Sequence, residues 1–119
     1  MSVQIFGVKN SQETRAAERF FKERKVQIHY VDLKVKPMAA GEIKRFVDKY
    51  TLYGLLDKEG KEFEAAGLKY LRVSDSELLA RIEKEPKLLK LPLVRGGNKI
   101  TIGRDEEGWK GLLEAIQKK

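Results

Sequence analysis

The chain has 119 residues, of which 25 are Lys or Arg and 18 are Asp or Glu, so its formal net charge is +7. This length predicts one domain over residues 1–119 with a hydrophobic core, and the 41% hydrophobic content is typical of a soluble globular protein. The sequence contains no apolar run near the roughly 20 residues of a membrane span and no secretory signal. We therefore expect a cytoplasmic protein that does not bind membranes.

The sequence contains no cysteine, which excludes disulfides, thiolate metal sites and thiol chemistry. His29 is the single histidine, and without nearby ligand partners in the sequence it indicates a packing or surface residue rather than a metal site. The basic excess is mild and is concentrated in the first 36 residues, where eight bases face four acids. No basic motif with interleaved aromatic residues accompanies it, so direct nucleic-acid binding is not predicted.

The first elements predicted are a strand over residues 3–7, a tight loop over 8–10 and a helix that extends to about residue 21. Asn10 or Ser11 is a candidate N-cap of this helix. The helix carries an apolar stripe that faces a core, formed by Ala16, Ala17, Phe20 and Phe21. The loop ends at the free N–H groups of the helix, and that end favours an anion or a thiolate.

The middle of the chain predicts one further strand and then several helices. Residues 26–31 form the second strand, parallel to the first because a helix connects them. Helices are expected over 39–50, as a short helix over 50–56, as a short helix that contains Phe63 and Ala66 and ends at Gly67 next to Leu68, and from Ser74 to residue 85. Ser74 and Glu77 form the capping box of the last of these. We interpret residues of about 39–90 as a helical insertion within the domain.

The last third predicts a β-hairpin and a final helix. The strands cover 93–95 and 99–102, and the turn is Gly96-Gly97-Asn98, where glycine supplies positive φ. Asp105 begins the last helix. Its core stripe includes Trp109, which we expect to pack rather than to stack on a ligand.

The loop and the start of the helix resemble the arsenate reductase (ArsC) family, including its Spx and YffB-like branches. The residues that carry this resemblance are Lys9, Asn10 and Arg15, with Ser11 between them. There the loop carries a nucleophilic cysteine, as K-N-C in the YffB-like branch, with an arginine four residues later. Ser11 stands at the cysteine position. Thr14 stands where Spx proteins have a second cysteine.

Later segments carry the same resemblance in the same order. They are Leu55-Leu56 to Gly60, Phe63 to Leu68, Leu88-Leu89-Lys90-Leu91-Pro92-Leu93-Val94, Gly97, and Ile102-Gly103-Arg104. The resemblance implies an α/β, thioredoxin-like mixed four-stranded sheet with flanking helices and the helical insertion. It also implies that Pro92 is a structural cis-proline beside the loop.

For the site, the resemblance implies three arginines that hold an oxyanion around the cysteine. Asp57 and Leu91 occupy two of these positions, and Arg104 lies next to the third. Lys9, Asn10, Arg15 and Arg104 are thus the remaining candidates for anion binding, and Ser11 is the residue at the catalytic position. A hydroxyl cannot form the mixed disulfide with glutathione that the family's chemistry requires, and no motif supplies a base that would activate the serine.

Three interpretations remain open. The first is a redox-inactive family member that acts as a monomeric binding or regulatory module, with RNA polymerase as the partner that the Spx resemblance implies. The second is a thiol-dependent oxidoreductase, arsenate reductase-like and using glutathione, whose natural form has a cysteine at position 11. The third is a site that binds a small anion through Lys9, Arg15 and the helix N-terminus, without cofactor or metal.

Overall fold

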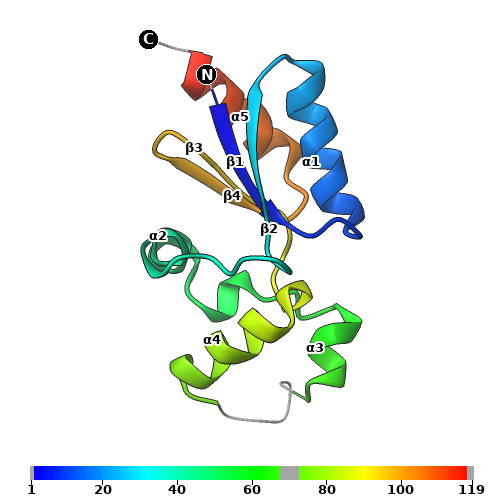
Figure 1. Cartoon of the computed structure of the whole chain (residues 1–119). Coiled ribbons are helices and arrows are strands. Elements are labelled where there is room, and N and C mark those ends of the chain that lie inside the picture. The colour runs from blue at the N-terminus through cyan, green and yellow to red at the C-terminus, as the bar shows by residue number, and fades with distance from the viewer. Residues whose placement is uncertain (1, 68–72, 118–119) are drawn as a thin grey trace. The chain divides into compact units, whose positions relative to one another are not determined.

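A computed structural model describes residues 2–67 and 73–117 of the chain (Figure 1). The chain divides into two compact units, one formed by Met1–Asp32 and Leu91–Lys119 and the other by Leu33–Lys90. The single domain expected over residues 1–119 stays a prediction. Within the described ranges, no helix is both long enough and apolar enough to cross a membrane.

In the described part of the first unit, four strands form one mixed sheet in the order β2-β1-β3-β4. The strands β1 and β2 are parallel, whereas β3 is antiparallel to both β1 and β4. This confirms the predicted parallel pair and the C-terminal hairpin. The elements of the unit are β1 (Ser2–Gly7), α1 (Gln12–Glu23), β2 (Gln27–Asp32), β3 (Leu93–Gly96), β4 (Lys99–Ile102) and α5 (Glu106–Gln117).

One face of the sheet is covered by α1 and α5 (Figure 1). Because side chains alternate along a strand, Val3 and Ile5 of β1 point to this face, and both are buried in the core that the two helices share. Trp109 of α5 is 1% exposed, and its ring centroid lies 5.6 Å from that of Phe20 and 6.5 Å from that of Phe21. The predicted stripe of α1 and the packing role of Trp109 are therefore confirmed.

At the end of α1, the basic residue Arg24 packs on an aromatic ring of the same helix. The guanidinium carbon of Arg24 lies 3.8 Å from the ring centroid of Phe20, and its Nη1 donates to the Phe20 carbonyl at 3.0 Å. Lys25 follows with φ of 59°, the left-handed conformation that often ends a helix. A cation over an aromatic face contributes about 0.5–1 kcal/mol at an exposed site.

The second unit is helical in its described part, as predicted for the insertion. It contains α2 (Ala40–Tyr50), the 3-10 helix η1 (Tyr53–Leu55), α3 (Lys61–Ala65), α4 (Asp75–Lys84) and the 3-10 helix η2 (Pro86–Leu88). Its core includes Phe46, Leu55, Leu56, Phe63, Leu78 and Ile82. The helix predicted to end at Gly67 is α3, which ends at Ala65, and Leu68 lies outside the described residues. The element η2 was not predicted, because Pro86 indicated only the end of α4.

Two backbone hydrogen bonds connect segments of the second unit that are distant in the sequence. The Asp57 N–H donates to the Leu88 carbonyl at 2.8 Å, and the Lys90 N–H donates to the Leu55 carbonyl at 2.7 Å. Ser74 caps α4, since its Oγ accepts from the Glu77 N–H at 3.2 Å. The Ser74 half of the predicted capping box is thus present.

The hairpin turn is shorter than predicted. Gly96 belongs to β3 and pairs with Lys99, so the turn is Gly97-Asn98, and Gly97 has φ of 60°. Gly96 has a different reason to be glycine: a Cβ there would collide with the Leu112 side chain of α5. The sequence pattern could not separate a glycine that a turn requires from one that a helix contact requires.

We expect Gly96→Ala to lower the free energy of unfolding by about 1–3 kcal/mol, because the added methyl group overpacks the contact with Leu112. Gly111→Ala is the matched control. It lies in α5 with open space around the position of a Cβ, so it should stabilise the protein by about 0.4–1 kcal/mol. Urea unfolding of both variants measures this. Equal effects of the two substitutions would contradict the proposed contact.

Tyr30 of β2 packs against the edge of the core of the first unit. Its hydroxyl is buried and has no hydrogen-bond partner among the described residues. Burial, followed by the nearby carboxylates of Asp32 and Glu18, raises the pKa of Tyr30 to about 12. The folded protein therefore holds this proton to a higher pH than the unfolded chain does.

From this pKa we expect a stability contribution that is fully present below about pH 10 and is lost as the pH rises from about 10 to about 12. The loss should be on the order of 1 kcal/mol, since Tyr30 as a whole residue is only half-buried and nearby solvent screens the charge. Tyr30→Phe removes the titrating group. Urea unfolding of both proteins at about pH 9 and about pH 11.5 should show the larger loss in the wild type; equal losses would refute the assignment.

Candidate functional site

The loop between β1 and α1 is built around Ser11. The Ser11 N–H donates to the Val8 carbonyl at 3.1 Å, which closes the loop. The Ser11 Oγ accepts from the Thr14 N–H at 3.2 Å, and the Ser11 carbonyl accepts from the Arg15 N–H at 3.1 Å. Ser11 is therefore the N-cap of α1. The alternative prediction, that Asn10 is the cap, is wrong, and Asn10 is exposed.

The surroundings of Ser11 are tightly packed. Ser11 is 7% exposed and Thr14 is fully buried. A Cβ on Gly7, the last residue of β1, would collide with the Thr14 side chain, so glycine is needed for this approach of strand and helix. The Thr14 hydroxyl has no hydrogen-bond partner among the described residues.

The structure places no histidine base beside Ser11. His29 pairs with Gln4 in the parallel register, whereas Asp32 pairs with Gly7 at the loop end. The three residue steps from His29 to Asp32 correspond to about 10 Å along the strand. A serine nucleophile needs a base within hydrogen-bond distance. The geometry of the loop therefore gives Ser11 the role of a cap.

Pro92 lies at the same end of the sheet as the loop. The peptide bond between Leu91 and Pro92 is cis, which confirms the prediction. Because Leu93 pairs with Phe6, continuing the register by one residue brings Pro92 opposite Gly7. The Pro92 carbonyl accepts from the Gly103 N–H at 3.1 Å, so the end of β4 reaches the same place.

The predicted anion-binding side chains are exposed, and one of them is already paired. Lys9, Asn10 and Arg15 are exposed, and within the described residues their side chains make no hydrogen bond or ion pair. Arg104 follows β4 at this end of the sheet, but its Nε donates to Glu106 at 3.2 Å, with both side chains 57% exposed. Its charge is therefore already paired on the surface.

The two positions where the resemblance implies further arginines hold no cation. Leu91 is 7% exposed and apolar. Asp57 belongs to the second unit, where its carbonyl accepts from the Gly60 N–H in a turn. Over the described ranges, no group of three His, Asp or Glu residues could hold a metal ion.

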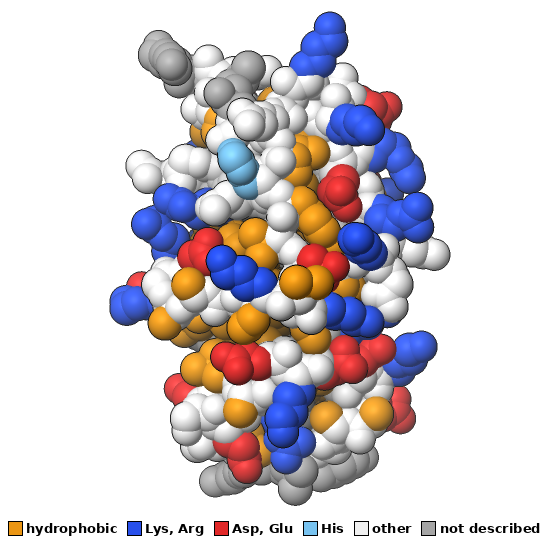
Figure 2. Space-filling view, in the orientation of Figure 1, with side chains coloured by type: hydrophobic (Ala, Val, Ile, Leu, Met, Phe, Trp, Pro, Cys, Tyr) orange, Lys and Arg blue, Asp and Glu red, His pale blue; other side chains and the backbone are white. Residues whose placement is uncertain are grey.

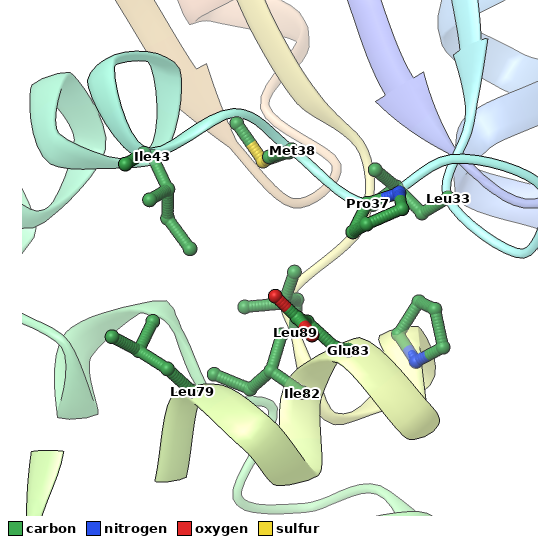
Figure 3. A pocket seen from close by; sticks show the side chains of 10 residues that line it. Leu33, Pro37, Met38, Ile43, Leu79, Ile82, Glu83 and Leu89 are labelled. Atoms are coloured by element: carbon green, nitrogen blue, oxygen red, sulfur yellow. The ribbon is translucent and has the colours of Figure 1, made fainter. Parts of the chain in front are cut away.

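The second unit contains an apolar pocket of about 160 Å³ (Figure 3). Leu79 and Ile82 of α4 face it from one side and Met38 and Ile43 from the other, while the carboxylate of Glu83 reaches its rim. An apolar cavity of about 150 Å³ can hold a molecule the size of benzene. The sequence pattern did not predict this pocket, because the spacing of Ile43, Leu79 and Ile82 indicated helix cores and no motif linked them to the connecting segments that complete the lining.

A polar hollow in the first unit was also missed. Gln4 of β1 and Arg95 of β3 pair across the sheet, and the Arg95 Nη1 donates to the Gln4 Oε1 at 3.1 Å. The alternation of polar and apolar residues along the strands could have indicated it. The apolar positions predicted the core, but the polar positions were not assigned to a common face.

If the loop still favours a negative charge, a cysteine introduced by Ser11→Cys should have a pKa below the ordinary value of about 8.5. The Thr14 N–H that bonds the serine would bond the thiolate, and the helix N-terminus and Lys9 add positive charge. Burial opposes this by disfavouring the charged form. We expect the hydrogen bond and the positive charges to have the larger effect.

The measurement is the pH dependence of iodoacetamide alkylation, since the introduced thiol is the single one in the chain. Ser74→Cys is the matched control, because Ser74 also caps a helix but is exposed and followed by Asp75 and Glu77. A midpoint for Ser11→Cys at or above that of the control would show that the loop no longer favours an anion.

Comparison with solved structures places this fold among known proteins. A YFFB protein superimposes with a TM-score of 0.80 at 16% identity, over 94% of this chain and 99% of that one. An arsenate reductase from Vibrio cholerae gives 0.74 at 19% identity, over 96% and 97% of the two chains. An arsenate reductase (ArsC) related protein from Brucella melitensis gives 0.63 at 20% identity, over 96% of both.

These structures show that the chain has the thioredoxin-like fold of the ArsC proteins, as predicted. A search of curated protein sequences finds no match. The sequence model of the ArsC family matches residues 6–112, which include the loop, the helical insertion and the hairpin. The protein belongs to the ArsC family.

Proposed function

We propose that this protein is a redox-inactive member of the ArsC family that works by binding a protein partner. The observation that carries the proposal is Ser11. This residue stands at the position that matches the family's cysteine, and the whole chain contains no cysteine. A serine hydroxyl does not undergo thiol–disulfide exchange, so the reaction with glutathione has no nucleophile.

The environment of Ser11 supports the same proposal. Its Oγ serves as the cap of α1, and the cation next to the hairpin, Arg104, is paired with Glu106. Asp57 and Leu91 replace two of the arginines that the resemblance implies. An oxyanion would thus lose most of its charge-assisted hydrogen bonds at this loop.

The apolar pocket of the second unit suits a partner segment. Its volume of about 160 Å³ fits one large apolar side chain, and Glu83 at the rim favours a basic residue beside that side chain. Figure 2 shows Lys and Arg interspersed with Asp and Glu on the visible face, without a broad basic surface of the kind that binds nucleic acid. The Spx resemblance, in which Ser11 and Thr14 stand at the two cysteine positions, makes RNA polymerase the first partner to test.

A second candidate function follows from the loop geometry. The Thr14 N–H is directed at the side chain of residue 11, and the cis-proline lies at the same end of the sheet. A natural form with cysteine at position 11 would find a helix N-terminus there and could act as a thiol-dependent oxidoreductase. The codon of the native gene at position 11 separates the two candidates.

The binding proposal predicts that purified bacterial RNA polymerase binds the protein with an affinity that thiol reductants do not change. Leu79→Arg should weaken this binding about tenfold or more, because a charge would enter the apolar pocket. Ala80→Arg is the control, since Ala80 is exposed on the same helix and does not line the pocket. Surface plasmon resonance measures all three proteins.

Three results would contradict the proposal. Arsenate reduction with glutathione above the background of heat-inactivated protein would show that the chain is not redox-inactive. Equal binding by the Leu79 and Ala80 variants would remove the pocket from the interface, and no binding by the wild type would exclude RNA polymerase as the partner.

A further inference from the structure

A polar hollow of about 340 Å³ lies in the first unit, on the sheet face opposite α1 and α5. It is lined by Ser2, Gln4, His29, Arg95 and Gly97. The register explains this gathering, because Gln4 of the central strand pairs with His29 on one side and with Arg95 on the other. Ser2 and the hairpin turn place the hollow at the end of β1 opposite the Ser11 loop, so it is a separate site.

Arg95 is the unusual member of this group. Its side chain is partly buried, its Nη1 donates to Gln4, and its Nε is buried without a hydrogen-bond partner. Among the residues that the structure describes, no carboxylate forms an ion pair with it. Partial burial of a guanidinium without a counter-charge is unfavourable. A bound anion would supply the missing charge.

The other lining groups can also donate hydrogen bonds. Because the Gln4 Oε1 accepts from Arg95, the amide nitrogen of Gln4 remains a donor. The Ser2 hydroxyl and the His29 ring provide further donors, and none of the lining residues is acidic. These donors come from three adjacent strands spaced about 4.8 Å apart, so they approach a ligand from different directions.

We propose that this hollow binds a phosphate group carried by a small polar molecule. A tetrahedral oxyanion offers acceptors in several directions, whereas a planar carboxylate offers two oxygens in one plane. The hollow is several times larger than inorganic phosphate, so it has room for an organic part. The polar lining favours a hydroxyl-rich organic part over an apolar one. This inference is independent of the proposed function, since it uses neither Ser11 nor the apolar pocket.

The test is a titration of the protein with inorganic phosphate and with glycerol 3-phosphate, followed by NMR shifts of backbone amides. Acetate at equal ionic strength is the control ligand. We expect shifts at residues 2–4, 29 and 95–97, with tighter binding of glycerol 3-phosphate than of inorganic phosphate. Acetate should bind more weakly than either.

Two substitutions with the same charge change separate the site from general electrostatics. Arg95→Gln should weaken phosphate binding about tenfold or more, the loss of one hydrogen bond from a charged donor. Arg19→Gln is the matched control: Arg19 is exposed on α1, which covers the other face of the sheet, so the effect should be less than about twofold. Arg95→Lys retains the charge and should bind at an intermediate level, and a thermal unfolding transition confirms that each variant is folded.

Several outcomes would overturn the proposal. Equal weakening of phosphate binding by the Arg95 and Arg19 substitutions would indicate that the binding depends on the net charge of the protein alone. Shifts confined to residues 8–12 would place the anion at the loop instead. Binding of acetate equal to that of phosphate would refute the ligand class, and no shifts with either phosphate ligand would refute the site.

Discussion

The structure of the first unit depends on the position of β1 between β2 and β3. This strand has a neighbour on each side, and its pleat separates two sets of side chains. Val3 and Ile5 enter the core with Trp109 and the phenylalanines of α1. Gln4 points to the opposite face and fixes Arg95. A shift of the register by one residue would exchange the two faces, so the core and the polar hollow have a common origin.

The two ends of β1 have different chemistry. At its C-terminal end, the chain enters α1 through Ser11, and the free N–H groups of the helix are partly satisfied by the serine side chain. At its N-terminal end, the Arg95 guanidinium, which forms no ion pair among the described residues, lies beside polar donors. Ser11 is thus a structural cap at one end of the strand, whereas the cation without a counter-charge lies toward the other end.

The second unit has a different organisation, since it contains short helices and two 3-10 turns instead of a sheet. Short helices leave backbone groups to be satisfied by other means, and the bonds from Asp57 to Leu88 and from Lys90 to Leu55 fulfil this role. The apolar pocket lined by Ile82 belongs to the same unit.

The sequence by itself determined the order of the strands and α-helices, the stripe of α1, the capping of α4 by Ser74, the cis-proline and the absence of a thiol, because each depends on local pattern or on a family motif. Tertiary structure decided what depends on partners distant in the chain. Gly96 is glycine because of Leu112 in a later helix. The choice of Ser11 over Asn10 as the cap and the pair between Arg104 and Glu106 are local contacts, and there the sequence pattern allowed more than one conformation. The meeting of Gln4 with Arg95, 91 positions later, required the antiparallel register, which no local pattern specifies.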